Sequence, residues 1–474
     1  IEVAGPGFLN ITLSPSWFVE ALRQIERDRR HYGGGFADPP ESILLEYVSA
    51  NPTGPPHVGH ARHAAYGDSL ARMLSFAGHD VTREYYVNDH GRQIEMFARS
   101  IIARYAALFD LDVEVPEDGY RGDYVDALAA RIREDVGEEY RDRVVDADDE
   151  TVAWFGDRGV ALMLDAIRED LSAFRTRFDA FSSERGLHVG GRVEHCLEAL
   201  EAGGSTYEQD GATWFRTTSF GDEKDRVLVR SDGSCTYLAS DVAYHLDKAA
   251  RGHDRLIDVL GADHHGYIAR LKAILAADGH DPDTLEVPIM QLVSLVERGV
   301  AKKMSKRAGT LVLLGELVDD IGVDAARFFL VQRSHDTALE LDLDLAREQS
   351  QENPVYYVQY AHARVCSILA QAEGAAEDGS APAPAELDPA ERALALRIAG
   401  WPEAVSAAVD KRAPHRVAAY SIDLARDLHA FYHRCRVVGE APEVQAFRLS
   451  LVRATRTVLA VALDLLGVEA PERM

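Results

Sequence analysis

The sequence predicts an α/β fold in which a doubly wound parallel sheet is interrupted by an inserted helical segment and followed by an all-α domain. Three observations support this prediction. Apolar runs of strand length alternate with helical patterns, an acidic and helix-like stretch from about 112 to 175 interrupts them, and strand signals vanish after about Leu343. With 474 residues, 46% of them hydrophobic, the chain is long enough for about two to four domains.

Two units carry the alternation of strands and helices. In the first, residues 43–48 (ILLEYV) form a run of strand length, the turn SANPTGPPHVG follows, and a helical pattern covers residues 60–77. A second strand-like run at 81–87 completes this unit. Residues 256–260, followed by GADHHG and an amphipathic helix, repeat the pattern. Such units predict parallel strands joined by helices that cover the faces of the sheet.

The last part of the chain shows helical periods only. Apolar residues recur there at helical spacing, as at Leu451, Val452, Thr455, Val458 and Leu459. The segment 371–391 is rich in Ala, Pro, Gly and acidic residues, which suits a loop between two helices. We therefore expect a separate helical domain from residue 343 onward.

The charge balance bears on the kind of partner. The chain has 51 basic and 78 acidic residues, a net charge of −27, which taken alone argues against a nucleic-acid binder because phosphates would be repelled. However, three of the seven lysines, Lys302, Lys303 and Lys306, lie within five residues of one another, and many arginines lie in the C-terminal third. An acidic surface with local basic tracts still permits an RNA partner.

Composition also limits the compartment and the metal chemistry. No stretch approaches ~18 uninterrupted apolar residues, and the N-terminus has no charged segment followed by an apolar one, so we expect a cytoplasmic protein with no membrane partner. The four cysteines, Cys196, Cys235, Cys366 and Cys435, are far apart and form no CxxC pair. Neither a disulfide framework nor a thiolate zinc site is expected, and we predict no dedicated metal site.

The strongest local signal is His57-Val58-Gly59-His60, which follows a predicted strand and opens a predicted helix. A glycine lets the backbone approach a phosphate, a helix N-terminus supplies oriented N–H groups, and two imidazoles can donate hydrogen bonds to charge that develops on a phosphate. The plainer alternative is a pair of histidines that merely cap a helix. The context of the motif favours adenylate chemistry.

The second signal is a basic segment that follows an apolar run at 289–296. It reads Lys302-Lys303-Met304-Ser305-Lys306 and continues as Arg-Ala-Gly-Thr. Lysine is a compact charge on a flexible stem, so a loop of this kind can close over a triphosphate and stabilise the departing pyrophosphate. A solvated run of charges is the alternative interpretation.

Together, these two segments resemble the HIGH and KMSKS motifs of class I aminoacyl-tRNA synthetases; they lie about 245 residues apart. The segments around them, including SANPTGPPHVGHARHAAYGDSLARMLSFAG, VTREYYVNDHGRQI, TYLASDVAYH, GADHHGY and NPVYYVQYAHARVCSI, resemble the arginyl-tRNA synthetase family specifically. The resemblance extends from Gly5 to Met474 and includes the C-terminal APERM.

The resemblance implies a division of the chain. Residues 41–342 would form the Rossmann-like class I catalytic domain, with an insertion at about 112–175 and the KMSKS-type loop at 302–310. Residues 343–474 would form the helical anticodon-binding domain. Members of this family normally begin with a domain that contacts the tRNA elbow, so residues 1–40 are expected to be a remnant of that domain and its connecting helix.

The resemblance also implies which residues bind arginine. Asn51 and His57 match positions that hold the α-amino and carboxylate groups. Glu184, Tyr237 and Asp241 match positions that recognise the guanidinium, which is sensible because a planar cation with five donors is best read by carboxylates. From the residues alone, the plainer interpretations are favoured, namely Glu184 as a surface acid and Asp241 as a helix N-cap; the resemblance reverses that preference.

The remaining roles follow in the same way. Gly261, Asp263 and His264 resemble the segment that meets the ATP ribose, and His264 would also border arginine. A shared metal site at the Asp263–His264–His265 run is disfavoured, because adjacent histidines point apart. The other expected ATP-binding residues are Gly59, Met304 and Ser305; the expected catalytic residues are His57, His60, Lys303 and Lys306.

The expected tRNA-binding residues are Tyr360, Arg364 and Met474. Aromatic residues interleaved with arginines can stack anticodon bases and hold the backbone. His429 and His433 have a helical i, i+4 spacing that could bind zinc, but no third ligand is evident in the sequence. They are interpreted as tRNA-facing or structural residues.

The predicted function is therefore that of an arginine–tRNA ligase, which activates L-arginine with ATP and Mg²⁺ and transfers it to the 3′-terminal ribose of tRNA(Arg). The resemblance further implies that bound tRNA is required for activation and that the enzyme is a monomer. Three alternatives stay open: a truncated, non-catalytic tRNA-binding protein, a small-molecule nucleotidylyltransferase, and a synthetase of another specificity.

Overall fold

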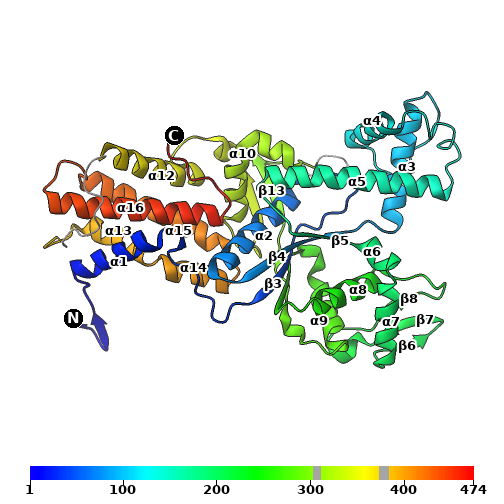
Figure 1. The fold of residues 1–474 in the computed structure, drawn as a ribbon, viewed down its shortest axis with the longest axis horizontal. Helices are drawn as coiled ribbons and strands as arrows, with labels where there is room; N and C mark the ends of the chain where they lie inside the picture. The colour runs from blue at the N-terminus through cyan, green and yellow to red at the C-terminus, as the bar shows by residue number, and fades with distance from the viewer. Residues whose placement is uncertain (303–310, 373–383) are drawn as a thin grey trace.

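The computed structural model describes residues 1–302, 311–372 and 384–474. In Figure 1 a central sheet separates a helical domain, on the left, from two groups of inserted elements on the right. The expected fold class, a parallel α/β sheet with a helical insertion and a helical C-terminal domain, is confirmed.

The central sheet has five strands in the order β11-β9-β3-β4-β5, and every pairing in it is parallel. The strands are β3 (Ser42–Glu46), β4 (Asp80–Val87), β5 (Ala180–Ser183), β9 (Arg255–Asp258) and β11 (Leu285–Glu286). Ile43, Leu44 and Leu45 are all buried, as consecutive residues are in a strand covered on both faces. The strand-like runs near residues 43, 81 and 256 are thus confirmed.

Helix α2 (Val58–Ala77) connects β3 to β4 and begins at the HVGH motif, as predicted. His57 is its N-cap, and Gly78 ends it in the left-handed conformation with φ of 110°. Small residues such as Ala61, Ala64 and Ala65 are fully buried along it, so the helix lies close to its neighbours. This arrangement fixes the motif at the carboxyl end of β3.

Two insertions extend the domain. The helical segment predicted at about 112–175 consists of α4 (Asp123–Val136) and α5 (Asp149–Ala173), which pack on α3 (Arg92–Ala107). A second layer was not predicted: β6, β7 and β8 form a small antiparallel sheet between α7 and α8. The elements of this layer are α6 (Glu184–Val189), α7 (Arg192–Ala202), β6 (Thr206–Gln209), β7 (Ala212–Phe215), η2 (Thr217–Phe220), β8 (Arg226–Val229) and α8 (Tyr237–Ala250).

Short elements complete the domain after β9. In order they are β10 (Leu260–Gly261), η3 (Ala262–Tyr267), α9 (Ile268–Ala277), η4 (Pro282–Thr284), β12 (Ile289–Met290), β13 (Val293–Glu297), β14 (Val300–Ala301), α10 (Leu314–Val331), β15 (Leu339–Asp342) and α11 (Leu343–Arg347). β10 pairs with β12, and β13 pairs with both β14 and β15.

The C-terminal domain is a bundle of helices, and beyond β15 the described residues contain no strand. Its helices are α12 (Pro354–Gln371), α13 (Pro389–Ala399), α14 (Trp401–Asp410), α15 (Pro414–Arg434) and α16 (Pro442–Leu465). Over the described parts of the chain, no helix is both long and apolar enough to cross a membrane.

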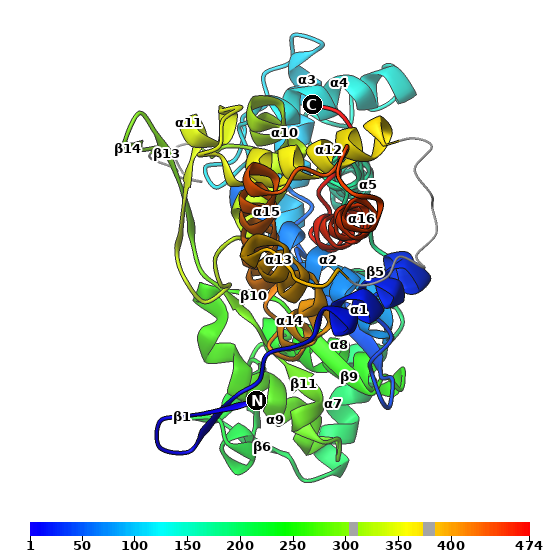
Figure 2. The same ribbon diagram turned by 90° about the vertical axis from the view of Figure 1, so that its left-hand side faces the viewer.

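The N-terminal segment lies against this bundle. Its elements are β1 (Glu2–Ala4), β2 (Phe8–Asn10), α1 (Pro15–Asp28) and η1 (Arg29–His31). Helix α1 packs on α13 and α16, and both views place it beside them (Figures 1 and 2). An ion pair of 3.2 Å between Arg453 and Glu26 joins α16 to α1.

Gly67 marks the closest contact of α2 with the segment after β3. A Cβ atom at this position would lie 2.2 Å from Cγ of the buried Tyr47 ring, well inside van der Waals contact. We expect Gly67→Ala to lower the free energy of unfolding by about 2–3 kcal/mol, because either the ring or the helix must move. Urea denaturation measures the change. Gly315→Ala in α10, where the nearest atom to the new Cβ is 4.0 Å away, is the control, and equal losses in both variants would contradict the expectation.

Candidate functional site

The HVGH motif is held in one conformation by hydrogen bonds to its own helix terminus. The Nδ1 atom of His57 accepts from the backbone N–H of Gly59 at 3.1 Å, and Nδ1 of His60 accepts from the N–H of His57 at 3.3 Å. The two imidazoles stack with their centroids 3.8 Å apart. Because both Nδ1 atoms are acceptors, each neutral ring carries its proton on Nε2, where it is a hydrogen-bond donor.

Gly59 is required by this arrangement. A Cβ atom there would lie 2.9 Å from Cε1 of His57, so a larger residue would displace the imidazole from the helix terminus. The interpretation of the two histidines as helix caps and their interpretation as phosphate-binding donors are therefore compatible, since capping through Nδ1 is what fixes the Nε2 donors.

Backbone pairing places the segment after residue 310 directly beside the motif. The N–H of Val58 donates to the carbonyl of Val312 at 3.0 Å, and the N–H of Leu314 donates to the carbonyl of Pro56 at 2.8 Å. The predicted lysine-loop residues Lys303, Met304, Ser305 and Lys306 lie outside the described residues. What the structure describes is the segment that follows them, and it contacts the turn that carries His57.

Arg62, which was not singled out from the sequence, joins this region to two loops. Its guanidinium is buried and donates to the carbonyls of Gln291 (2.7 Å), Ser334 (2.9 Å) and Thr337 (2.9 Å). Burial lowers its pKa to about 10. The neighbouring His63 has a pKa lowered to about 4, by burial and then by Arg62, so its ring is neutral at physiological pH.

Two carboxylates meet at the second part of the site. Glu184 is the first residue of α6, after β5, and only 6% of it is exposed, so it is not a surface acid. Asp241 lies in the second turn of α8, whose N-cap is Thr236, so the N-cap interpretation of Asp241 is wrong. Tyr86, at the end of β4, lies near both acids and stacks on Tyr244 at 4.0 Å.

The electrostatics of this pair favour a cationic ligand. Burial is the main cause that raises the pKa of Glu184 to about 7; the nearby charges of Asp241 and Asp89 act in the same direction, and a hydrogen bond from Ser240 opposes them. Burial also raises the pKa of Asp241. Neither carboxylate forms an ion pair with any residue in the described ranges. A cation between them would relieve both the burial cost and the mutual repulsion.

Asn51 lies between the ends of β3 and β4, where polar side chains gather. Its Oδ1 accepts from Nδ2 of Asn88 at 2.8 Å, and its Nδ2 donates to Oε1 of Gln93 at 2.9 Å. The site thus combines, at the carboxyl edge of a parallel sheet, an amide pair and a carboxylate pair. This edge is where ligands bind in open α/β sheets.

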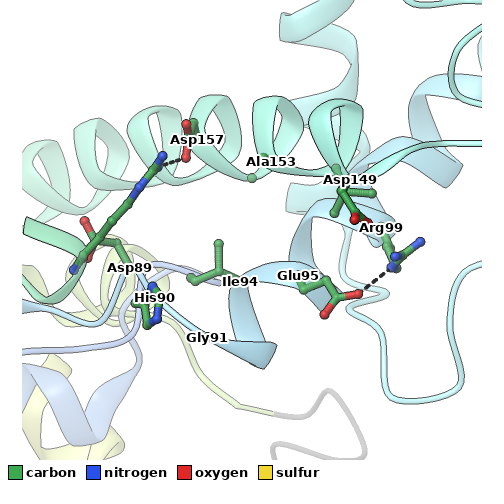
Figure 3. Close-up of a pocket in the computed structure, with 12 residues that line it drawn as sticks. Asp89, His90, Gly91, Ile94, Glu95, Arg99, Asp149, Ala153 and Asp157 are labelled. Carbon is green, nitrogen blue, oxygen red and sulfur yellow. Dashed lines mark hydrogen bonds and ion pairs between the residues drawn. The ribbon is translucent and has the colours of Figure 1, made fainter. Parts of the chain in front are cut away.

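A pocket lies between α3 and α5, and Arg185, the residue after Glu184, lines it (Figure 3). Asp89 lines it and accepts from Oγ of Ser183 at 2.6 Å, which ties the pocket wall to the residue before Glu184. Two ion pairs lie on the other walls, Arg99 with Glu95 and Arg185 with Asp157. The pocket is therefore bounded by the helical insertion, and none of the predicted site residues lines it.

The other predicted ligand residues are more open. Tyr237 begins α8 and is 69% exposed. Gly261 is the N-cap of η3, and Nε2 of His264 lies 3.6 Å from Oδ2 of Asp263. Among the described residues no group of three or more His, Cys, Asp or Glu side chains could hold a metal ion.

A second cluster lies on α12 and α15 of the helical domain. The rings of Tyr356 and Tyr360 are nearly parallel, with centroids 6.2 Å apart, and the Arg364 guanidinium lies over Tyr360 and Tyr432 at 4.9 and 4.3 Å. His429 packs edge-on against Tyr357 nearby, and burial lowers its pKa to about 4. Stacked rings beside a guanidinium suit unstacked RNA bases.

Comparison with known proteins covers the whole chain. Residues 28–362 match the family model "tRNA synthetases class I (R), catalytic domain", and residues 358–474 match "DALR anticodon binding domain". The arginine–tRNA ligases of Shouchella clausii (strain KSM-K16) and Bacillus subtilis (strain 168) are each 48% identical to the chain, covering all of it and 85% of their own length. A solved structure from Campylobacter jejuni, assigned as an arginyl tRNA synthetase, superimposes with a TM-score of 0.89 at 35% identity, covering 98% of this chain and 100% of that one. The Thermus thermophilus arginyl-tRNA synthetase superimposes with a TM-score of 0.79 at 26% identity, over 98% of this chain and 87% of that one.

Proposed function

Because the chain belongs to the arginyl-tRNA synthetases and is an arginine–tRNA ligase, we propose how its residues divide that reaction. Residues 41–342 carry out the chemistry, and residues 343–474 bind the anticodon. A non-catalytic tRNA-binding protein is not favoured, since the relatives that match the whole chain are ligases.

Glu184 and Asp241 hold the guanidinium of arginine, and this pair of carboxylates, one buried and one part-buried, is the observation that carries the proposal. A guanidinium donates several hydrogen bonds in one plane, and two carboxylates can accept them together. A lysine ammonium is a compact charge that cannot donate in this planar geometry. The hydroxyl of Tyr237 adds an acceptor at the open end of the pocket. Asn51 and His57 bind the α-amino and carboxylate groups, with His264 beside them.

The adenylate step needs donors at the α-phosphate. The arginine carboxylate attacks the α-phosphorus of ATP, and the bond to pyrophosphate breaks. The Nε2–H groups of His57 and His60 stabilise the charge that builds on the phosphate oxygens, as preorganised donors do. Gly59, Gly261 and Asp263 bind the nucleotide. Lys303, Met304, Ser305 and Lys306, which lie outside the described residues, are assigned to ATP and pyrophosphate on their sequence motif alone.

ATP is the substrate, and Mg²⁺ is proposed to arrive with it. In this proposal the ion is bound by the phosphates of the nucleotide. When bound, Mg²⁺ neutralises phosphate charge. The protein's own contribution is the orientation of the nucleotide by the α2 terminus.

The second step joins arginine to tRNA. The 3′-terminal ribose hydroxyl of tRNA(Arg) attacks the adenylate carbonyl and AMP leaves. Tyr360 and Arg364 contact anticodon bases, and the exposed Met474 lies on the same domain. The proposal includes a requirement for bound tRNA in the first step, a monomeric enzyme and, because translation takes place there, a cytoplasmic location.

The test is arginine-dependent exchange of pyrophosphate into ATP, with and without tRNA(Arg), followed by aminoacylation of the same tRNA. Exchange that requires both arginine and tRNA supports the whole proposal. Exchange without tRNA would leave the ligase intact and remove the tRNA requirement. Exchange driven by another amino acid would overturn the roles given to Glu184 and Asp241.

Arginine should bind about tenfold more weakly at pH 6 than at pH 8. The pKa of Glu184 is raised to about 7, so a falling pH protonates it and removes the charge that the guanidinium needs. Calorimetric titration with arginine at both pH values measures the two dissociation constants. Glu184→Gln should bind more weakly but with little change between these pH values, and a parent enzyme with equal constants would contradict the assignment.

A further inference from the structure

A row of three buried carboxylates crosses the central sheet. Glu84 of β4 is paired in register with Glu46 of β3, and Glu46 is paired in register with Asp258 of β9. Paired residues of neighbouring strands project from the same face, so the three acids form one row. They are 0%, 7% and 2% exposed, respectively. Charges buried in a sheet need partners on the element that covers them.

Helix α8 supplies those partners. Nζ of Lys248 donates to Glu46 and, at 2.7 Å, to Oδ1 of Asp258, and Lys248 has no exposed surface. The guanidinium of Arg251 donates hydrogen bonds to both carboxylate oxygens of Glu84. Lys248 and Arg251, three residues apart on one face of α8, therefore both contact the row of carboxylates. The contact between α8 and the sheet is ionic at these positions.

The hydroxyl of Tyr244 completes the row by bridging its first two members. It lies 2.9 Å from Oε2 of Glu46 and 2.8 Å from Oε1 of Glu84. Its ring stacks on Tyr86 of β4, next to the carboxylate site. The network thus reaches the wall of the proposed arginine pocket.

His245 takes part as a cation, because both of its ring nitrogens face acceptors. Nε2 lies 3.0 Å from Oδ2 of Asp258, and Nδ1 lies 2.8 Å from the backbone carbonyl of Asp241. Neither oxygen carries a proton to donate while Asp258 is ionised, so both nitrogens must donate. With His245 charged, the three carboxylates of the row face three cations, and Arg251 also pairs with the more exposed Asp247 of α8 at 3.3 Å.

We propose that His245 and Lys248 are positioning residues for arginine recognition: through the carboxylate row they fix where α8 lies along the sheet, and so where Asp241 meets the guanidinium. Asp241 is one turn before His245, and its carbonyl is bonded to that ring. Apolar packing tolerates small shifts, whereas an ionic network has few alternative arrangements. The inference rests on the proposed role of Asp241.

The experiment compares His245→Asn with the charge-balanced double variant His245→Asn/Asp258→Asn, which removes one cation and one anion together. In tRNA-supported exchange, both should raise the KM for arginine by about 10- to 100-fold, with kcat and the KM for ATP within about threefold of the parent. Discrimination between arginine and L-citrulline, an isostere without the cationic group, should fall in the same variants. Folded Lys248→Met should likewise show a raised KM for arginine with little change in kcat and in the KM for ATP.

Two controls separate the possible failures. Arg448→Met breaks a part-buried ion pair with Glu391 in the helical domain, and it should lower the unfolding temperature without raising the arginine KM. Asp241→Asn tests the underlying assignment. A normal arginine KM in Asp241→Asn would overturn the proposed role of Asp241, whereas a raised KM there with a normal KM in the folded double variant would overturn the positioning role alone.

Discussion

Replacing Asp241 with alanine should lower kcat/KM for arginine by about three orders of magnitude in tRNA-supported exchange. In this variant the guanidinium of arginine would still contact Glu184, but it would lose the carboxylate of Asp241 inside a site shielded from solvent. Removing one partner of a desolvated charge pair costs about 2–5 kcal/mol. Steady-state exchange at several arginine concentrations measures the ratio, and most of the change should appear in KM.

Stability provides the control for this variant. Burial raises the pKa of Asp241, so the ionised carboxylate is disfavoured in the folded protein and its contribution to stability falls as pH rises through that pKa. At pH 8 the unfolding temperature of Asp241→Ala should therefore be no lower than that of the parent. Glu194→Ala, an exposed acid on the neighbouring α7, should leave kcat/KM unchanged. If Asp241→Ala unfolds at a lower temperature than the parent, its loss of activity is explained by misfolding. If its kcat/KM is unchanged, Asp241 does not bind the guanidinium.

The parts of the fold that could be predicted from the sequence are those determined by residues close together in the chain. The strand near residue 43, the HVGH turn and Gly78 follow one another in the chain, and each carries a periodicity or a conformational preference of its own. The parallel sheet follows from two such units. The β6–β8 sheet was missed because its strands have only four residues each and are largely part-exposed or exposed, so their apolar runs are too short to indicate a strand.

The parts that could not be predicted depend on register. Glu46 and Glu84 stand in strands nearly forty residues apart, and only the pairing of β3 with β4 brings them together beneath α8. Lys248 likewise reads as an ordinary charge near a helix end, although it is fully buried. The resemblance to a family could indicate Asp241, but not the ionic network behind it. Tyr86 was missed for the same reason, since its place beside Glu184 is set by the pairing of β4 with β5.

A comparison of His57→Asn with His57→Ala separates the two tasks of the HVGH motif. Asparagine caps helices well but has no group at the position of Nε2, whereas alanine removes both the cap and the donor. Both variants should lower kcat for exchange by about 100- to 1000-fold, the usual cost of one preorganised donor. Only His57→Ala should also lose about 1 kcal/mol of stability in urea denaturation.

His60→Ala extends the same logic to the second donor. It should reduce kcat to a similar extent, and the double variant with His57→Asn should be far less impaired than the product of the single effects, because both donors act on one phosphate. A full multiplication of the losses would mean that the two imidazoles serve separate groups. In that case the stacking of the rings at 3.8 Å would reflect helix capping alone, and the donor role would have to be reassigned to one of them.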